Sequence, residues 1–171
     1  MPERRGFLKF LTSGLGALVG AVAGVPALRY IGYPWVEKTV SGGEDPIRVA
    51  SPDDVKPGQP LRVTVVGNRR DGWLRMDDVK LGACWLVRGD DGHVRAFSTC
   101  CPHLGCGIDW NEQTRQFDCP CHGSVFDTGG RCVAGPSPRG MDELDVQVGG
   151  NDVKVTYRRF RVSTSKKEPL A

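Results

Sequence analysis

The sequence predicts an all-β protein, an antiparallel β-sandwich or open barrel with a small inserted lobe, preceded by a single N-terminal transmembrane helix. Three observations predict this fold class. Short runs of alternating apolar and polar residues recur from residue 47 onward, as in half-buried strands. The 171 residues include 23 Gly and 12 Pro, so turns are dense and a helical bundle is excluded. Residues 10–28 form an uncharged, mostly apolar run, as a membrane-spanning helix requires.

The N-terminal segment, residues 1–9, is expected to be a cytoplasmic twin-arginine signal region. Arg4 and Arg5 precede the apolar run and look like a twin-arginine export signal, with the basic region of a general secretory signal as the alternative. Together with Lys9, these arginines should keep the N-terminus in the cytoplasm. The rest of the chain would then lie on the outer, periplasmic side of the inner membrane.

Residues 10–30 are expected to form a retained membrane anchor. A helix over residues 10–28 would be roughly 28 Å long, close to the hydrocarbon thickness of a bilayer. Small residues around Ala23 also fit a processing site, and cleavage there would give a soluble protein instead. Residues 31–46 follow, and the Gly and Ser at their centre predict a flexible hinge.

The outer domain is expected over residues 47–162, followed by a basic C-terminal tail over 163–171. Turn signals such as Asp91-Gly92 and Gly149-Gly150 separate the candidate strands. The strand-like runs are 61–66, 84–87, 94–97, 144–148 and 153–157. Residues 100–130 are rich in Gly, Cys and His and poor in strand pattern, which predicts the small inserted lobe.

The charge of the chain argues against a nucleic-acid partner. The formal net charge is +3, from 23 Lys and Arg against 20 Asp and Glu. No basic stripe of the kind that follows a phosphate backbone is present in the sequence. The seven Cys and three His are the more informative residues.

Two clusters of metal-ligating residues lie in the predicted lobe, at residues 101–106 (CPHLGC) and 119–124 (CPCHGS). Two thiolates and two imidazoles match a tetrahedral zinc site in number, but each cluster would then have a spare Cys. The pair Cys119 and Cys121 lacks the Cys-x-x-Cys spacing of a thioredoxin motif. A 2Fe–2S cluster that takes one Cys and one His from each loop is favoured, with zinc as the alternative.

Cys101-x-His103 and Cys119-x-x-His122, separated by 15 residues, resemble the signature of the Rieske iron–sulfur family. The resemblance implies that these four residues bind one 2Fe–2S cluster, with both thiolates on one iron and both imidazoles on the other. The resemblance extends to the export signal, the anchor, the hinge and a Pro-rich loop. In these features the chain is similar to Rieske subunits of bacterial, menaquinol-type cytochrome bc complexes.

The resemblance also implies roles for residues around the cluster. Cys106 and Cys121 would form a disulfide that braces the two loops, and an oxidising outer compartment would preserve it. Ser124 would donate a hydrogen bond to a cluster sulfur. The Pro-rich loop would cover the cluster through Gly135, Pro136 and Pro138.

Three further roles concern the quinol substrate. By resemblance, His122 would contact the quinol hydroxyl and accept its proton, and His103 would be the other exposed ligand. Leu104 would pack against a cytochrome b subunit. Phe126 stands where high-potential relatives carry a Tyr that donates a hydrogen bond to a ligand sulfur. A lower redox potential, suited to menaquinol, is therefore expected.

The remaining cysteines are expected to be structural. Cys84 and Cys132 lie in strand-like runs and should be small buried apolar residues, with a disulfide between them left open. Cys100 adjoins a ligand and should point away from the iron.

The expected function is that of the Rieske subunit of a quinol–cytochrome c oxidoreductase, which is not active alone. The subunit would accept an electron and a proton from (mena)quinol and pass the electron to a c-type cytochrome. Its partners would be a cytochrome b subunit, the c-type cytochrome, quinol and the membrane. The alternatives are the small Rieske subunit of an arsenite-oxidase-type enzyme and a soluble periplasmic Rieske electron carrier.

Overall fold

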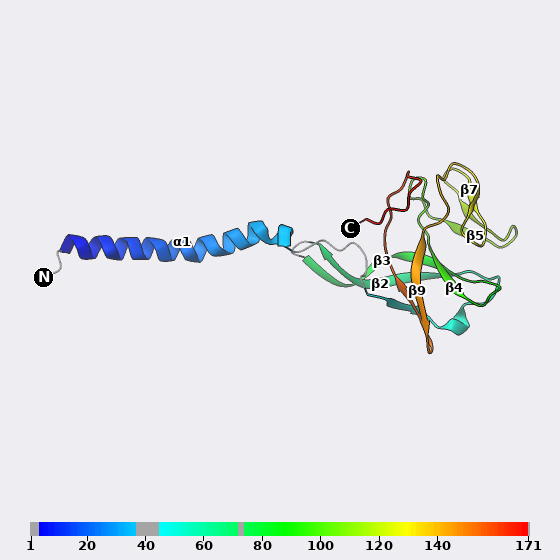
Figure 1. The fold of residues 1–171 in the computed structure, drawn as a ribbon, viewed down its shortest axis with the longest axis horizontal. Helices are drawn as coiled ribbons and strands as arrows, with labels where there is room; N and C mark the ends of the chain where they lie inside the picture. Colours follow the sequence, from blue (N-terminus) through cyan, green and yellow to red (C-terminus); the bar gives the residue numbers. More distant parts are fainter. Residues whose placement is uncertain (1–3, 37–44, 72–73, 171) are drawn as a thin grey trace. The chain divides into compact units, whose positions relative to one another are not determined.

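The computed structural model describes residues 4–36, 45–71 and 74–170, and the chain divides into two compact units, residues 1–39 and 40–171. Among the described residues, the first unit contains one α-helix and the second contains ten β-strands and a short 3-10 helix, Pro52–Asp54 (Figure 1). Every pairing between named strands is antiparallel, as the sequence predicts.

Helix α1, Arg4–Val36, contains the predicted anchor and is longer than it at both ends. It is long and apolar enough to cross a membrane, which indicates a single-pass anchor. Its last six residues fall in the segment expected to be a hinge. The reason is compositional, because residues 31–36 are mostly apolar or aromatic and the Gly-Ser run begins only at Ser41. Residues 37–44, the centre of the expected hinge, lie outside the described residues.

Six strands form the base sheet of the second unit, in the order β1-β10-β9-β4-β3-β2. Their bounds are β1 Ile47–Ala50, β2 Leu61–Asp71, β3 Leu74–Arg88, β4 Val94–Ser98, β9 Glu143–Gly149 and β10 Asp152–Thr156. The edge strand β1 also contacts the other edge strand, β2, so the sheet curls into an almost closed barrel. The open barrel predicted from the sequence is confirmed, and each of the five strand-like runs overlaps one of these strands.

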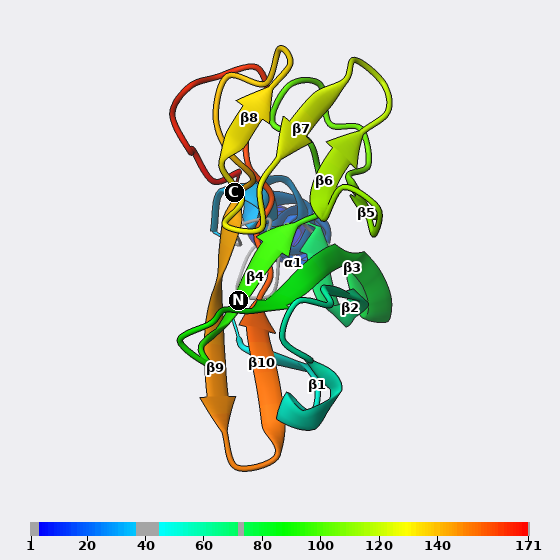
Figure 2. The ribbon, with the colours of Figure 1, turned by 90° about the vertical axis from the view of Figure 1, so that its right-hand side faces the viewer.

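A second, smaller sheet forms the lobe, inserted between β4 and β9, with the order β5-β6-β7-β8. Its strands are β5 Asp109–Asn111, β6 Gln116–Cys119, β7 Ser124–Phe126 and β8 Cys132–Ala134. Figure 2 shows β6, β7 and β8 beyond the end of the base strands β3 and β4. The lobe expected over residues 100–130 is itself a small sheet, and its last strand ends at Ala134. Strands of three or four residues are too short for their alternation to be recognised in a sequence.

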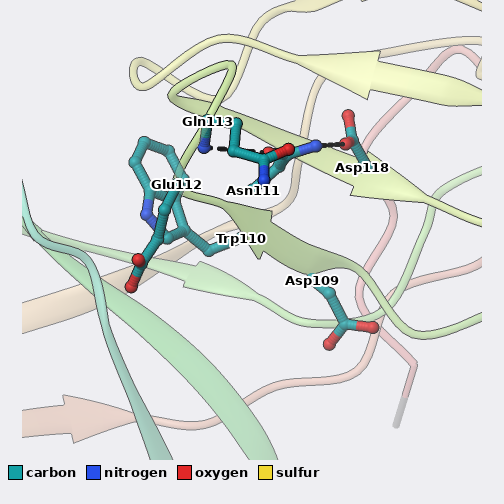
Figure 3. Close-up of a pocket in the computed structure, with 6 residues that line it drawn as sticks. All are labelled: Asp109, Trp110, Asn111, Glu112, Gln113 and Asp118. Carbon is teal, nitrogen blue, oxygen red and sulfur yellow. Dashed lines mark hydrogen bonds between the residues drawn. The ribbon is translucent and has the colours of Figure 1, made fainter.

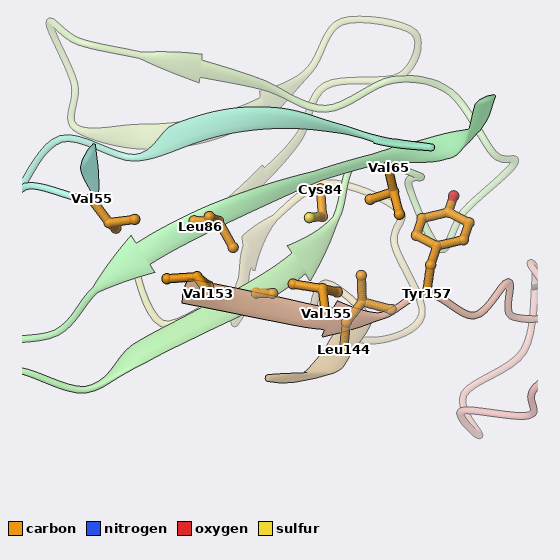
Figure 4. Close-up of a cluster of buried hydrophobic side chains, with 9 residues drawn as sticks. Val55, Val65, Cys84, Leu86, Leu144, Val153, Val155 and Tyr157 are labelled. Atoms are coloured by element: carbon orange, nitrogen blue, oxygen red, sulfur yellow. The ribbon is translucent and has the colours of Figure 1, made fainter. Parts of the chain in front are cut away.

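Two hydrophobic cores support the second unit. The first fills the barrel with side chains such as Val65, Leu86 and Val155, and it contains the fully buried Cys84 (Figure 4). Burial raises the pKa of the Cys84 thiol to about 12, in keeping with the predicted structural role. Cys132 is half-buried on the lobe strand β8 and both cysteines are free thiols, so the open possibility of a Cys84–Cys132 disulfide is excluded.

The second core joins the lobe to the base sheet. Trp85 and Phe97, from β3 and β4, pack in one buried cluster with Phe117 and Phe126 of the lobe. The Trp85 indole also donates a buried hydrogen bond of 2.9 Å to the carbonyl oxygen of Ile108. The lobe is therefore fixed to the barrel by shared packing and not by its chain connections alone.

The residues after β10 do not extend away as a tail. The backbone N–H of Arg161 donates to the carbonyl of Glu168 at 2.9 Å, and that of Leu170 donates to Arg159 at 2.8 Å. An isolated antiparallel bridge pairs Phe160 with Pro169. Residues 159–170 therefore form a C-terminal hairpin, which lies beside the lobe (Figure 2).

Candidate metal centre

The two Cys- and His-containing loops have the same backbone turn. Each begins with Cys-Pro and has Gly four residues after the Cys, and the Gly N–H donates back to the Cys carbonyl. The distance is 2.9 Å from Gly105 to Cys101 and 3.1 Å from Gly123 to Cys119. Both glycines have a left-handed conformation, with φ of +82° and +70°, which L side chains disfavour. The pattern Cys-Pro-x-x-Gly thus specifies the turn in both loops.

A disulfide joins the two loops at the cysteines that the resemblance assigns to it. Cys106 and Cys121 are bonded, and their Cα atoms are 6.5 Å apart. The sulfur of Cys119 lies within 4.8 Å of both disulfide sulfurs. Because the disulfide sulfurs are not thiolates, Cys119 is the sole possible thiolate ligand of this trio. The disulfide therefore lies directly beside the Cys119 thiol.

Two free thiols, Cys101 and Cys119, are buried between the loops. Burial raises the pKa of Cys101 to about 11, the backbone N–H of His103 acts in the opposite direction, and the nearby Cys119 thiol raises the pKa again. The buried Cys101 thiol is therefore poorly placed to ionise without a nearby cation. Bound iron would supply the positive charge that makes both Cys101 and Cys119 thiolates.

The two imidazoles lie side by side. The ring centroids of His103 and His122 are 4.7 Å apart, and the ring planes are at 87°. His122 is exposed, whereas His103 is half-buried. The buried Nδ1 of His103 has no hydrogen-bond partner among the residues that the structure describes. A buried ring nitrogen without a partner is costly unless it binds a metal.

Ser124 contributes a second buried polar atom of this kind. Its Oγ is buried and, within the described residues, has no hydrogen-bond partner. A hydroxyl that donates to a cluster sulfur would remove that cost. Two thiols, two imidazoles and an unsatisfied hydroxyl therefore fit a 2Fe–2S cluster with mixed Cys and His ligands.

The two loops end in an exposed tip, and the Pro-rich loop lies against the second of them. Leu104 is 56% exposed, and Cys121 and His122 are also exposed, so an apolar and imidazole surface faces outward. Gly135, with φ of +91°, begins the Pro-rich loop directly against the backbone of Ser124. Pro136 and Pro138 are exposed. The Pro-rich loop therefore contacts the second Cys-His loop at its first residue.

The structure also contains a hollow of about 440 Å³ on the outside of the lobe, shown in Figure 3. Its lining includes three carboxylates and Trp110, and the amide of Asn111 donates to Asp118 at 2.9 Å. None of the predicted site residues lines this hollow. It is separate from the two Cys-His loops.

Two residues that the sequence did not single out support the first Cys-His loop. Ser163 donates to the carbonyls of Pro102 and His103, and Arg139 binds the chain on both sides of Ser163. No local sequence signal could have identified these residues, since the partners named here lie between 22 and 61 residues away.

An almost closed antiparallel barrel with two thiols and two imidazoles on paired loops defines an iron–sulfur protein with mixed Cys and His ligation. The model of the Rieske [2Fe-2S] domain matches residues 45–155. The chain therefore belongs to the Rieske [2Fe-2S] family, and its cofactor is a 2Fe–2S cluster.

Two relatives and one solved structure show how far the similarity extends. The menaquinol:cytochrome c reductase iron-sulfur subunit of Bacillus subtilis is 30% identical, over 80% of each chain. The cytochrome b6-f complex iron-sulfur subunit 2 of Synechocystis sp. is 36% identical, over 79% of this chain and 73% of the relative. The apo form of a quaternary ammonium Rieske monooxygenase shares the fold, with a TM-score of 0.50 and 20% identity, over 67% of this chain and 33% of that one.

Proposed function

We propose that Cys101 and Cys119 bind one iron of the cluster and that His103 and His122 bind the other. The unpartnered, buried Nδ1 of His103 beside the second imidazole is the observation that carries this assignment. The Cys106–Cys121 disulfide braces the two loops. Ser124 donates to a cluster sulfur, and Gly135, Pro136 and Pro138 cover the cluster.

The chain acts as the Rieske subunit of a quinol–cytochrome c oxidoreductase and is not active alone. It takes an electron and a proton from menaquinol and passes the electron to a c-type cytochrome. The relatives named above, which are subunits of menaquinol:cytochrome c reductase and of cytochrome b6-f complexes, support this proposal. A cytochrome b subunit is the implied partner at the quinol site.

The protein's own residues bind and orient quinol and receive its proton. When bound, the cluster supplies a one-electron redox centre. The exposed His122 would meet the quinol hydroxyl through the ring nitrogen that is not bound to iron, and it would accept the proton there when that nitrogen carries none. Leu104 packs against cytochrome b and removes water from the contact. Gly123 has no side chain, so the backbone beside His122 leaves room for quinol to approach.

The domain lies on the outer side of the inner membrane, held by α1 as a retained anchor. Arg4, Arg5 and Lys9 keep the N-terminus in the cytoplasm, and the paired arginines direct twin-arginine export.

Electron paramagnetic resonance of dithionite-reduced membranes tests the cluster, and co-purification tests the complex. The expected result is a Rieske-type signal from a protein that resists a carbonate wash and co-purifies with a haem-bearing cytochrome b. A molybdenum-containing partner would support an arsenite-oxidase-type role instead. Release by the wash, with an N-terminus after Ala23, would support a soluble carrier. Zinc without acid-labile sulfide would refute the proposal.

Replacing Phe126 by Tyr should raise the midpoint potential. Phe126 is fully buried in the same cluster of side chains as Cys101 and Cys119, so a hydroxyl at this position could reach a ligand sulfur. A hydrogen bond that stabilises the reduced cluster by about 1.4 kcal/mol would raise a one-electron potential by on the order of 60 mV. A spectroscopic redox titration measures the shift. Phe126→Leu, which adds no donor, is the control, and an unchanged midpoint in Phe126→Tyr would contradict the prediction.

Replacing Leu104 by Asp should slow quinol oxidation and leave the cluster intact. Leu104 is exposed at the tip, and a carboxylate there would be buried against cytochrome b without a partner. Loss of an apolar contact of about 1.5–3 kcal/mol predicts that the rate of quinol-dependent cytochrome c reduction falls by at least about tenfold. Val148→Asp changes an equally exposed side chain on the β9–β10 hairpin and should have no such effect. Equal rates for the two variants would rule out the Leu104 contact.

A further inference from the structure

The C-terminal hairpin, residues 159–170, contacts the loop that carries His103. The backbone N–H of Ser163 donates to the carbonyl oxygen of Pro102 at 2.8 Å. The hydroxyl of Ser163 donates to the carbonyl oxygen of His103 at 2.7 Å. A single residue of the hairpin thus binds two consecutive carbonyls of the first Cys-His loop.

These two hydrogen bonds fix the backbone on both sides of His103. The Pro102 carbonyl belongs to the planar peptide group before the His103 Cα, and the His103 carbonyl belongs to the one after it. With both peptide groups held, the two soft backbone dihedrals of His103 are held as well. The direction of its Cα–Cβ bond, and hence the reach of the imidazole, is therefore set by Ser163.

Ser163 itself is held in an uncommon conformation. Its φ is +60°, in the left-handed region, where a non-glycine residue is unfavourable without support from its surroundings. The support comes from Arg139, whose guanidinium donates to the carbonyl of Arg161 at 2.8 Å and to that of Thr164 at 2.5 Å. Arg139 therefore binds the chain two residues before Ser163 and at the residue directly after it.

Arg139 is a buried charge with a matched partner. Its side chain is 10% exposed and that of Asp142 is 5% exposed, and two hydrogen bonds of 2.9 and 2.8 Å join them. The carbonyl of Asp142 accepts a hydrogen bond of 2.8 Å from the backbone of Ser98, at the end of β4. The support of Ser163 thus leads back to the base barrel, which is the rigid part of the domain.

From this chain of contacts we infer that Ser163 is a positioning residue for His103, and that the Arg139–Asp142 pair holds Ser163 in place. The inference rests on the proposed role of His103 as an iron ligand. Partners of a metal ligand that orient its ring tune both the affinity for the metal and the properties of the centre. The segment that the sequence suggested to be a basic tail is therefore part of the support of the metal centre.

Two substitutions at position 163 separate the hydroxyl from the backbone conformation. Ser163→Ala removes the hydroxyl and keeps a Cβ at positive φ, whereas Ser163→Gly removes the hydroxyl and also relieves the strain. If the hydroxyl positions His103, both variants should change the centre in the same direction. Val155→Ala, which opens a cavity in the barrel core, is the control for a general loss of stability.

The measurements use the full chain in detergent-solubilised membranes. We expect Ser163→Ala and Ser163→Gly to shift the g-values and the midpoint potential and to lose visible cluster absorbance about fivefold faster than the unmodified protein. Arg139→Lys, which keeps the charge but not the fork of donors, should change the g-values in the same direction. Val155→Ala should leave g-values and potential unchanged.

The outcomes distinguish this inference from the proposed function. If the unmodified protein gives no Rieske-type signal, the assignment of His103 as a ligand fails. If the unmodified protein gives the signal and both Ser163 variants match it in g-values, potential and rate of cluster loss, the positioning role is refuted. If Val155→Ala produces the same spectral change as the Ser163 variants, the effect is one of general stability and the inference is likewise refuted.

Discussion

Removal of the Cys106–Cys121 disulfide should cost the protein most of its cluster. The bond links the two Cys-His loops across 15 residues, and a cross-link that closes a loop of this size contributes about 3 kcal/mol in the chain-entropy model. Separation of the loops should therefore become on the order of 100-fold more frequent in the double variant Cys106→Ala, Cys121→Ala. The sulfur of Cys119 lies beside this disulfide, so water would enter next to a ligand.

Acid-labile sulfide per protein and the decay of visible absorbance measure this loss. Replacing both cysteines avoids a new free thiol next to the centre. Cys132→Ala, on the lobe strand β8, is the matched control because this free thiol makes no bond to either loop. Wild-type occupancy and decay in the double variant would show that the loops do not need the bond.

The substitution Gly135→Ala should lower the cluster content about as much as removal of the Cys106–Cys121 disulfide. Its Cβ would overlap the Cα of Ser124 and lie 2.6 Å from the carbonyl oxygen of Gly123, and neither backbone atom can move aside cheaply. The φ of +91° adds strain that any L side chain would feel. Gly135→Ala should therefore displace the second Cys-His loop or the Pro-rich loop and destabilise the domain by more than about 1 kcal/mol.

Two other glycines separate the causes of this effect. Gly92 also has a positive φ, +79°, but a Cβ there would meet no atom within 4 Å of it among the described residues. Gly149 does not have a positive φ, and a Cβ there would also meet no atom within 4 Å among the described residues. Cluster content after purification should be highest in Gly149→Ala, lower in Gly92→Ala and lowest in Gly135→Ala. A Gly135→Ala protein with the content of Gly92→Ala would mean that the close approach to Ser124 is not needed.

Much of the barrel could be predicted because its signals are local. The runs 144–148 and 153–157, which overlap β9 and β10, each alternate over five residues, and Gly150 marks the turn between them. The lobe strands, by contrast, have three or four residues each, and their sheet depends on contacts with Trp85 and Phe97 in the barrel. Such contacts between distant parts of the chain leave no periodic pattern in the sequence.

The same distinction explains what could be predicted of the site. The Cys and His of each loop are separated by only one or two residues, so their spacing can be recognised in the sequence. The structure brings the four proposed ligands and the disulfide close together. The hairpin that supports His103 could not be predicted, since residues 163–168 are all polar and carry no strand pattern. Hydrogen bonds to Arg139 and to the carbonyls of Pro102 and His103 hold the hairpin in place.

The packing of Trp85 and Phe97 against Phe117 and Phe126 has a thermodynamic consequence for the whole β domain. Since barrel and lobe bury the same side chains, neither can melt without exposing the other, and the two should unfold as one cooperative unit. Free energy released by cofactor binding at one end would then protect strands at the opposite end. In calorimetry, loading with iron should therefore shift a single heat-absorption peak to a higher temperature.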